Sequence, residues 1–257
     1  MKLLALGDVV GEETLKFLAH KLPAARRELG ADLVIANGEN VANIHGISPA
    51  MAQSLLDCGV DLITSGNHIF DRRDIYPFLD TSPAILRPAN YPAECPGVGF
   101  RTVTSADGWQ VLVVNVSGVA FMEPLSSPFA AVEHALSASR GKYDLAVLDV
   151  HAEATSEKLA IARYFDGRFA AIFGTHTHVP TADECVSQNG TGYITDLGMT
   201  GPIDGILGVE ADAVIEKMRA HMPHRFFVAS GEIRAHGALF DIDGASARAR
   251  SVKRIVL

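Results

Sequence analysis

The sequence predicts an α/β fold built from two mixed β-sheets flanked by helices. In the first third of the chain, short apolar segments alternate with longer helical segments, the pattern of a buried, largely parallel sheet. Later, two pairs of strand-like segments flank Asp-Gly dipeptides, which favours antiparallel hairpins and a second sheet packed on the first. No repeat, low-complexity tract or linker interrupts this order, so we expect a single domain over residues 1–257.

Three strands and two helices are expected in the first third of the chain. Ser48 and Pro49 predict the start of the second helix, which ends near Cys58, because Ser is a favoured N-cap and Pro a favoured first helical residue. The other expected elements are strands at Leu3–Leu6, Leu33–Ala36 and Leu62–Thr64, and a first helix at Thr14–Leu29.

The rest of the chain adds two hairpins and further α/β alternation. Asp107-Gly108 joins the strands of the first hairpin and Asp243-Gly244 those of the second, and we assign both hairpins to the second sheet. The expected elements are strands at Val98–Thr104, Val111–Val116, Leu145–Val150, Ala170–Phe173, Ala235–Asp241 and Ala247–Val256, and helices at Phe129–Ser139 and Glu157–Phe165.

Composition excludes several classes of protein. The net charge of −8 argues against a broad cationic face, so we expect neither extended nucleic-acid binding nor attachment to an anionic membrane. A small phosphate ester stays compatible, because bound cations reverse the local field. The three cysteines form no CxxC pair, which disfavours a disulfide framework or zinc ribbon and fits a reducing compartment. No apolar run is long enough to span a membrane. We therefore expect a soluble, cytoplasmic protein.

Polar side chains able to bind metals recur where the predicted strands end. Ligands in open α/β sheets bind at the carboxyl ends of strands, so these side chains are expected to converge on one crevice. They are Asp8, Glu39, Asn40, Asn67, His68, His151, His176 and His178.

Each of these residues also has an ordinary structural interpretation. Asp8 alone is typical of a turn or helix cap, Glu39-Asn40 of a solvated turn, and His151 of a hydrogen-bonded core histidine. His176-x-His178 is more specific, because alternate residues of an extended segment point the same way. The joint placement at strand ends is what favours a metal site.

The mixture of ligands indicates the class of metal. Without a thiolate, structural zinc is disfavoured, whereas carboxylate, amide and imidazole together suit iron, manganese, zinc or cobalt at an open site. Seven ligands are too many for one tetrahedral ion and suit two, with Glu39 as a bridge. Two neighbouring ions of this kind serve phosphoester hydrolysis.

The same motifs resemble a known superfamily. Gly7-Asp8, Gly38-Glu39-Asn40, Gly66-Asn67-His68, His151 and Gly174-Thr175-His176-Thr177-His178 are similar to the signature of calcineurin-like metallophosphoesterases. The Glu-Asn pair resembles more narrowly the bacterial YmdB-type branch. Further similarity to that branch lies in the runs 151–158 and 195–202 and in Arg225-Phe226, so the resemblance covers nearly the whole chain.

The resemblance implies two ligand sets. One ion would be surrounded by Asp8, Glu39, Asn40 and His178, and the other by Glu39, Asn67, His151 and His176. His68 would stand beside the ions as a proton donor. The branch implies iron as the metal and cyclic nucleotides, notably 2′,3′-cyclic AMP, as substrates.

The chain departs from the wider superfamily at Val10, where a histidine is usual, and Asn40 is expected to take its place. The branch's Gly-Arg after the first motif is also missing here. His45, in the loop after Asn40, is interpreted as a solvated residue, with substrate contact as the alternative.

We hypothesise that a metal-bridging hydroxide attacks phosphorus while His68 protonates the departing ribose oxygen, a step worth about 10²–10⁴-fold. The structural alternative is that His68 only supports a metal ligand. Two rival functions stay open: a phosphomonoesterase or nucleotidase using the same ions, and a non-catalytic, metal-bound regulatory protein. The sequence leaves the oligomeric state open as well, a homo-oligomer included.

Overall fold

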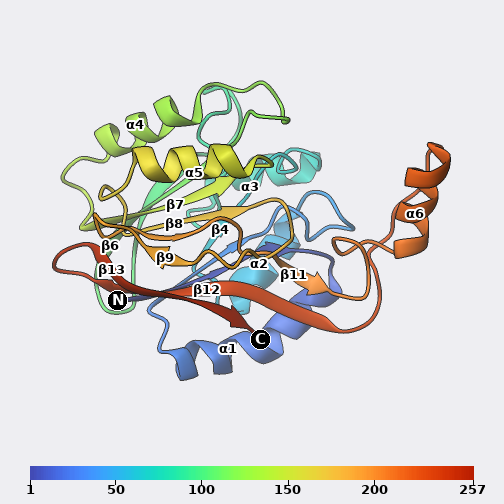
Figure 1. Cartoon of the computed structure of the whole chain (residues 1–257), viewed down its shortest axis with the longest axis horizontal. Helices are drawn as coiled ribbons and strands as arrows, with labels where there is room; N and C mark the ends of the chain where they lie inside the picture. The colour runs from blue at the N-terminus through green and yellow to red at the C-terminus, as the bar shows by residue number, and fades with distance from the viewer.

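The structure, a computed structural model, describes residues 1–257 and contains two mixed β-sheets packed face to face between helices (Figure 1). This confirms the fold class expected from the sequence. The first sheet has the strand order β2-β11-β12-β1-β3-β4, with β13 paired to β12. The second sheet has the order β5-β6-β7-β8-β10-β9.

In the first sheet, β1, β3 and β4 run parallel, as the alternation of strands and helices predicted. β12 lies antiparallel between β1 and β11. The strands of this sheet are β1 (Lys2–Leu6), β2 (Asp8–Val9), β3 (Leu33–Asn37), β4 (Leu62–Thr64), β11 (Met199–Pro202), β12 (Ile233–Asp243) and β13 (Arg248–Val256).

In the second sheet, the hairpin β5-β6 is antiparallel and the strands β6, β7, β8 and β10 run parallel. The strands are β5 (Phe100–Thr104), β6 (Gln110–Ser117), β7 (Leu145–His151), β8 (Ala171–Thr175), β9 (Cys185–Val186) and β10 (Gly192–Ile194).

Helices cover both outer faces. α1 and α2 pack on the first sheet and α4 and α5 on the second, whereas α6 projects away from the body (Figure 1). Ser48 caps α2 by accepting a hydrogen bond from the Met51 amide at 3.3 Å, as predicted. The helices are α1 (Glu13–Leu29), α2 (Pro49–Asp57), the short 3-10 turn η1 (Arg73–Ile75), α3 (Tyr76–Thr81), α4 (Pro128–Ala138), α5 (Thr155–Tyr164) and α6 (Ala211–Ala220).

The core has three apolar layers, set by the alternation of side chains along each strand. In β1, Leu4 and Leu6 face α1 and α2, while Leu3 and Ala5 face the second sheet. Phe240 of β12 fills the layer between the sheets. Because both faces of the central strands are buried, their sequences are continuously apolar rather than alternating.

One assignment from the sequence was wrong. The C-terminal hairpin β12-β13 belongs to the first sheet, where Leu4 of β1 pairs with Leu239 of β12. The pattern of the hairpin is local and contains nothing about which strand it will join. The sequence pattern also contained no clear signal for α6, α3 or the short strands β2, β9, β10 and β11. No helix of the structure is long and apolar enough to cross a membrane.

Candidate metal centre

The metal-binding side chains predicted from the sequence lie at one edge of the two packed sheets. Asp8 follows β1, while Glu39 and Asn40 follow β3. Asn67 and His68 follow β4, His151 ends β7, and His176 and His178 follow β8. Since β1, β3 and β4 are parallel in one sheet and β7 and β8 in the other, their carboxyl ends meet at the same edge.

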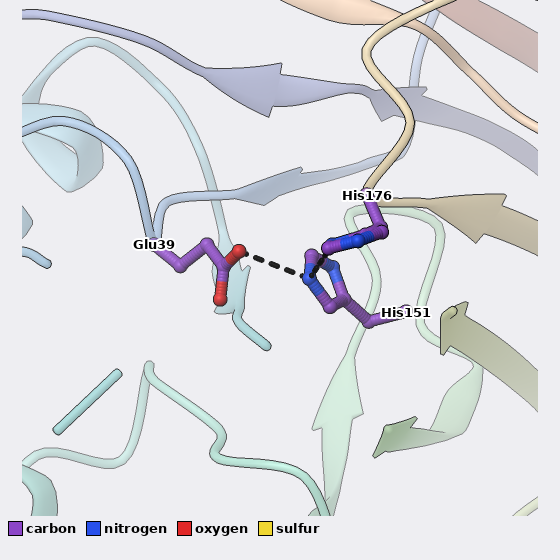
Figure 2. A group of neighbouring side chains, drawn as sticks. All are labelled: Glu39, His151 and His176. Carbon is purple, nitrogen blue, oxygen red and sulfur yellow. Dashed lines mark hydrogen bonds and ion pairs between the residues drawn. The ribbon is translucent and has the colours of Figure 1, made fainter. Parts of the chain in front are cut away.

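One group of donor atoms gathers around the His151 imidazole. Its Nε2 lies 2.9 Å from Glu39 Oε1 and 3.0 Å from Asn67 Oδ1. His176 Nδ1 lies 3.1 Å from the same nitrogen (Figure 2). These are the four residues of one predicted ligand set. Such crowding of a carboxylate, an amide oxygen and two imidazoles suits a shared cation.

The second group gathers around His178. Its Nε2 lies 3.3 Å from the Asn40 amide nitrogen and 3.9 Å from Asp8 Oδ1. Asn40 in turn lies 3.4 Å from Glu39 Oε1, which connects the two groups. Glu39 therefore lies between the two groups of donor atoms.

Two buried oxygen atoms in this centre have no hydrogen-bond partner, Asp8 Oδ1 and Asn40 Oδ1. Buried polar atoms in proteins are nearly always hydrogen-bonded, so each unpaired oxygen needs an explanation. Burial also raises the pKa of Asp8, although His178 and His151 oppose the shift. Unpaired oxygens beside buried carboxylates are what a cation would satisfy, so the donor set fits metal ions.

The charges of the first group are strongly coupled. Burial alone would raise the pKa of Glu39, but the adjacent His151 lowers it to about 2. Burial alone would lower the pKa of His151, but Glu39 outweighs it and the pKa rises to about 9. Burial and the charge on His151 lower the pKa of His176 to about 3. The surroundings therefore favour a proton on His151 and disfavour one on His176.

A second layer of polar residues, which sequence reasoning missed, orients the ligands. His151 Nδ1 lies 2.9 Å from the Thr175 hydroxyl, and that hydroxyl donates to Asp149 at 2.9 Å. Glu153 Oε2 lies 3.1 Å from His176 Nε2. Partners of this kind fix the orientation of ligating imidazoles. Burial raises the pKa of Asp149 to about 7.

His68 stands at the rim rather than among the donor groups. Its Nδ1 lies 2.8 Å from Asp71 Oδ2, and its backbone N–H donates to Glu39 Oε2 at 2.9 Å. Asp71 was not among the predicted site residues, although the spacing of three residues on one turn was a usable signal. His45 is exposed in its loop, as expected, and its ring stacks on His68 with ring centroids 3.9 Å apart.

The turn that carries His176 and His178 differs from expectation. It is not extended: φ is +100° at His176 and +64° at His178, both in the left-handed region. Val10, at the position of the missing histidine, is buried and forms a bridge to Asn40. Asn40 therefore lies beside the position that a histidine would fill in the wider superfamily.

The centre opens into a cavity of about 340 Å³. Glu39, Asn40, His68, His176 and His178 line its polar side. Its apolar wall is made of Ile44, Leu207, Val209 and Phe226. This wall adjoins the polar side, because the Leu207 carbonyl oxygen lies 3.1 Å from His178 Nδ1. The cavity thus combines charged groups with a surface suited to an apolar or flat part of a ligand.

Comparisons with known proteins agree with this architecture. Residues 4–255 match the YmdB-like protein family. The chain is 40% identical over 257 residues to a 2′,3′-cyclic-nucleotide 2′-phosphodiesterase of Bacillus subtilis, covering 100% of this chain and 97% of that protein. It is 32% identical over 249 residues to a putative phosphatase/phosphodiesterase of Mycoplasma genitalium, covering 94% and 88%.

Solved structures show the same fold. A hypothetical protein from Thermus thermophilus superimposes with a TM-score of 0.93 at 40% identity, covering 100% of this chain and 99% of that one. A structure described as a novel phosphatase from Mycoplasma pneumoniae gives a TM-score of 0.93 at 30% identity, covering 100% and 93%.

Proposed function

Because the chain belongs to the YmdB-like family, we propose that it is a metal-dependent phosphodiesterase that hydrolyses 2′,3′-cyclic nucleotides. Its relatives are named as phosphodiesterases and phosphatases, so the chain is a phosphoester hydrolase. The observation that carries the proposal is that seven donor side chains lie in two adjoining groups, in which two buried oxygens, Asp8 Oδ1 and Asn40 Oδ1, lack hydrogen-bond partners. The cyclic nucleotide is taken from the name of the Bacillus subtilis relative and from the residues that line the cavity.

Two ligand sets would hold two transition-metal ions. Asp8, Asn40 and His178 belong to one set, Asn67, His151 and His176 to the other, and Glu39 to both. Bound there, the ions would supply an activated water and neutralise charge on the phosphate. The donors include both imidazole and carboxylate but no thiolate, which suits iron, manganese or zinc. Iron is our choice among them because the resemblance to the YmdB-type branch implies it.

His68 is proposed as the general acid. Asp71, 2.8 Å from Nδ1, holds the ring in one orientation through a hydrogen bond to that nitrogen. This leaves Nε2 as the nitrogen free to donate to a leaving oxygen. The side chain lines the cavity without entering either donor group. A proton donor at the rim is suited to the departing ribose oxygen.

The apolar wall supports a nucleotide rather than a bare phosphate. Phe226 and Leu207 line the same cavity as the side chains proposed to bind metal. Stacking on an aromatic side chain is tolerant of base identity. We therefore expect the base to lie against this wall while the cyclic phosphate faces Glu39.

The proposal is tested by metal analysis of anaerobically purified protein together with a panel of substrates. We expect about two equivalents of transition metal and turnover of 2′,3′-cyclic nucleotides above 3′,5′-cyclic nucleotides, linear diesters and monoesters. Preference for monoesters would instead indicate a nucleotidase using the same centre. Fewer than two equivalents, with no turnover under any added metal, would overturn the proposal.

A further inference from the structure

Lys158 and Asp196 form an ion pair in the interior of the protein. Lys158 Nζ lies 2.7 Å from Asp196 Oδ2, and each side chain is only 1% exposed. Removing two charges from water is costly, so a pair of this kind needs precise partners. Neither residue belongs to the donor groups of the metal centre. Their hydrogen bonds show what the pair holds.

Asp196 forms hydrogen bonds with Thr177, the residue between the two proposed histidine ligands. Its Oδ2 accepts hydrogen bonds from the Thr177 hydroxyl at 2.8 Å and from the Thr177 backbone N–H at 3.2 Å. Its backbone carbonyl accepts from the Thr181 N–H at 3.1 Å. The carboxylate is thus anchored to Lys158 on one side and to the His176-Thr177-His178 turn on the other.

The Asp196 carboxylate is also linked to Asp8 by two hydrogen bonds that share one residue, Gly198. Its Oδ1 accepts a hydrogen bond from the Gly198 N–H at 2.8 Å. The Gly198 carbonyl accepts from the Asp8 N–H at 3.2 Å. Asp8 Oδ2 in turn accepts from the His176 N–H at 3.0 Å. The ion pair therefore closes a ring of contacts around both ligand-bearing segments.

The turn needs such support because its backbone is strained. His176 and His178 both have positive φ, a region that residues with a Cβ rarely occupy. A strained turn persists only where the surrounding structure over-determines it. Lys158 supplies part of the support for this turn, because its side chain packs directly against Gly174. A Cβ added to Gly174 would lie 2.8 Å from Lys158 Cδ.

We propose that Lys158 and Asp196 are positioning residues, which hold the His176-Thr177-His178 turn in the conformation that binds metal. The inference rests on the proposed function, because it assumes that these histidines are ligands. It assigns the buried ion pair a role in metal affinity rather than only in the stability of the fold.

The test uses the hydroxyl of Thr177, because its removal leaves no unpaired charge in the interior. Thr177→Val keeps the shape and the backbone N–H bond to Asp196 but removes the bond from the hydroxyl. Thr177→Ser keeps the hydroxyl and is the matched control. A double variant, Lys158→Met with Asp196→Asn, removes both charges together. Metal affinity is measured by competition with a chelator, and the melting temperature of the metal-free protein is measured in parallel.

We expect T177V and the double variant to bind metal about 10–100-fold more weakly than wild type, with T177S close to wild type. The metal-free T177V protein should melt within a few degrees of wild type. Wild-type affinity in a folded T177V or double variant would overturn the inference alone. A wild-type protein that binds no metal would overturn the proposed function as well.

Discussion

His151 is the residue on which the electrostatics of the centre depend. Its Nε2 lies between Glu39 Oε1 and Asn67 Oδ1, and Glu39 holds its pKa at about 9 against the effect of burial. In the unfolded chain its pKa is near 6.5. A proton therefore binds more tightly to the folded, metal-free protein than to the unfolded chain. A metal cation must displace that proton.

The metal-free protein should lose stability as the pH rises from about 6.5 to 9. Because the pKa of His151 is raised on folding, its contribution is complete below pH 6.5 and disappears as pH passes the folded value. Melting curves recorded with a chelator present measure this slope. The metal-loaded protein and the His151→Gln variant should both lack this dependence of stability on pH. An equal slope in that variant would assign the effect to another group.

Replacing His68 with Ala should lower turnover about 10²–10⁴-fold while metal content stays unchanged. The physical reason is that the His68 side chain contacts Asp71 and lines the cavity. Only its backbone N–H, which alanine keeps, contacts Glu39 of the donor groups. Steady-state kinetics and metal analysis on the same preparation measure both quantities. Asp71→Asn should cause a smaller loss. Retained turnover in H68A would restrict His68 to structural support.

At the scale of elements, short exits after the strands bring the ligands together. The turn after β4 passes so close to His151 that a Cβ on Gly66 would overlap the imidazole ring. A Cβ on Gly7, after β1, would overlap the Gly198 carbonyl oxygen. Glycine is required at these two positions because neighbouring atoms leave no room for a Cβ, and not only because the chain turns there.

Gly66→Ala should reduce both stability and metal content. The added methyl group must displace the His151 imidazole or the β4 exit, at a cost of about 1–3 kcal/mol. Thermal melting and metal analysis measure the two effects. Gly108→Asn is a suitable control, because this hairpin glycine has positive φ and no atom within 4 Å of an added Cβ. Full metal content in G66A would contradict the geometry of this turn.

The segment between β11 and β12, which includes α6, contributes Leu207, Val209 and Phe226 to the apolar wall of the cavity. Phe226→Ala should raise KM for a 2′,3′-cyclic nucleotide about tenfold, because base stacking on an aromatic ring is worth about 1–3 kcal/mol. Kinetics with a ribose cyclic phosphate that lacks a base should change little. Phe227→Ala is the matched control, since Phe227 is exposed and does not line the cavity.

At the scale of the whole molecule, the two ends of the chain are joined in one sheet. β12 pairs with β1 on the register Leu4–Leu239 and also with β11. The site is therefore held by a sheet that is incomplete until the last strands are present. One apolar layer lies between the two sheets, and the other two lie between a sheet and its helices. The position of the candidate metal centre therefore depends on the packing of both sheets.

A chain that ends at residue 232 should fail to fold, whereas a chain that ends at residue 243 should fold with reduced stability. The first loses β12 and exposes the edges of two strands, while the second loses only β13. Far-UV circular dichroism and thermal melting distinguish these cases. A cooperative transition in the shorter chain would show that β12 is dispensable.

The order of elements and the ligand residues could be predicted because their signals are local. Apolar strands, the Ser48 cap and polar residues at strand ends each depend on a few neighbouring positions. The predicted metal ligands Glu39, Asn67, His151 and His176 were selected in this way, and they lie together in the structure. Convergence followed because parallel strands share one carboxyl edge.

Local patterns in the amino-acid sequence were therefore sufficient for the fold class and the family, and for selecting polar residues at the strand ends that lie together in the structure. Three-dimensional contacts were needed to learn that the last hairpin joins β1, that Asp71 holds His68, and that Lys158 reaches Asp196. The same is true of the left-handed backbone at His176 and His178. Most of these features depend on contacts between segments distant in the chain. Patterns among neighbouring residues do not encode such contacts, whereas packing and the pairing of buried charges select them.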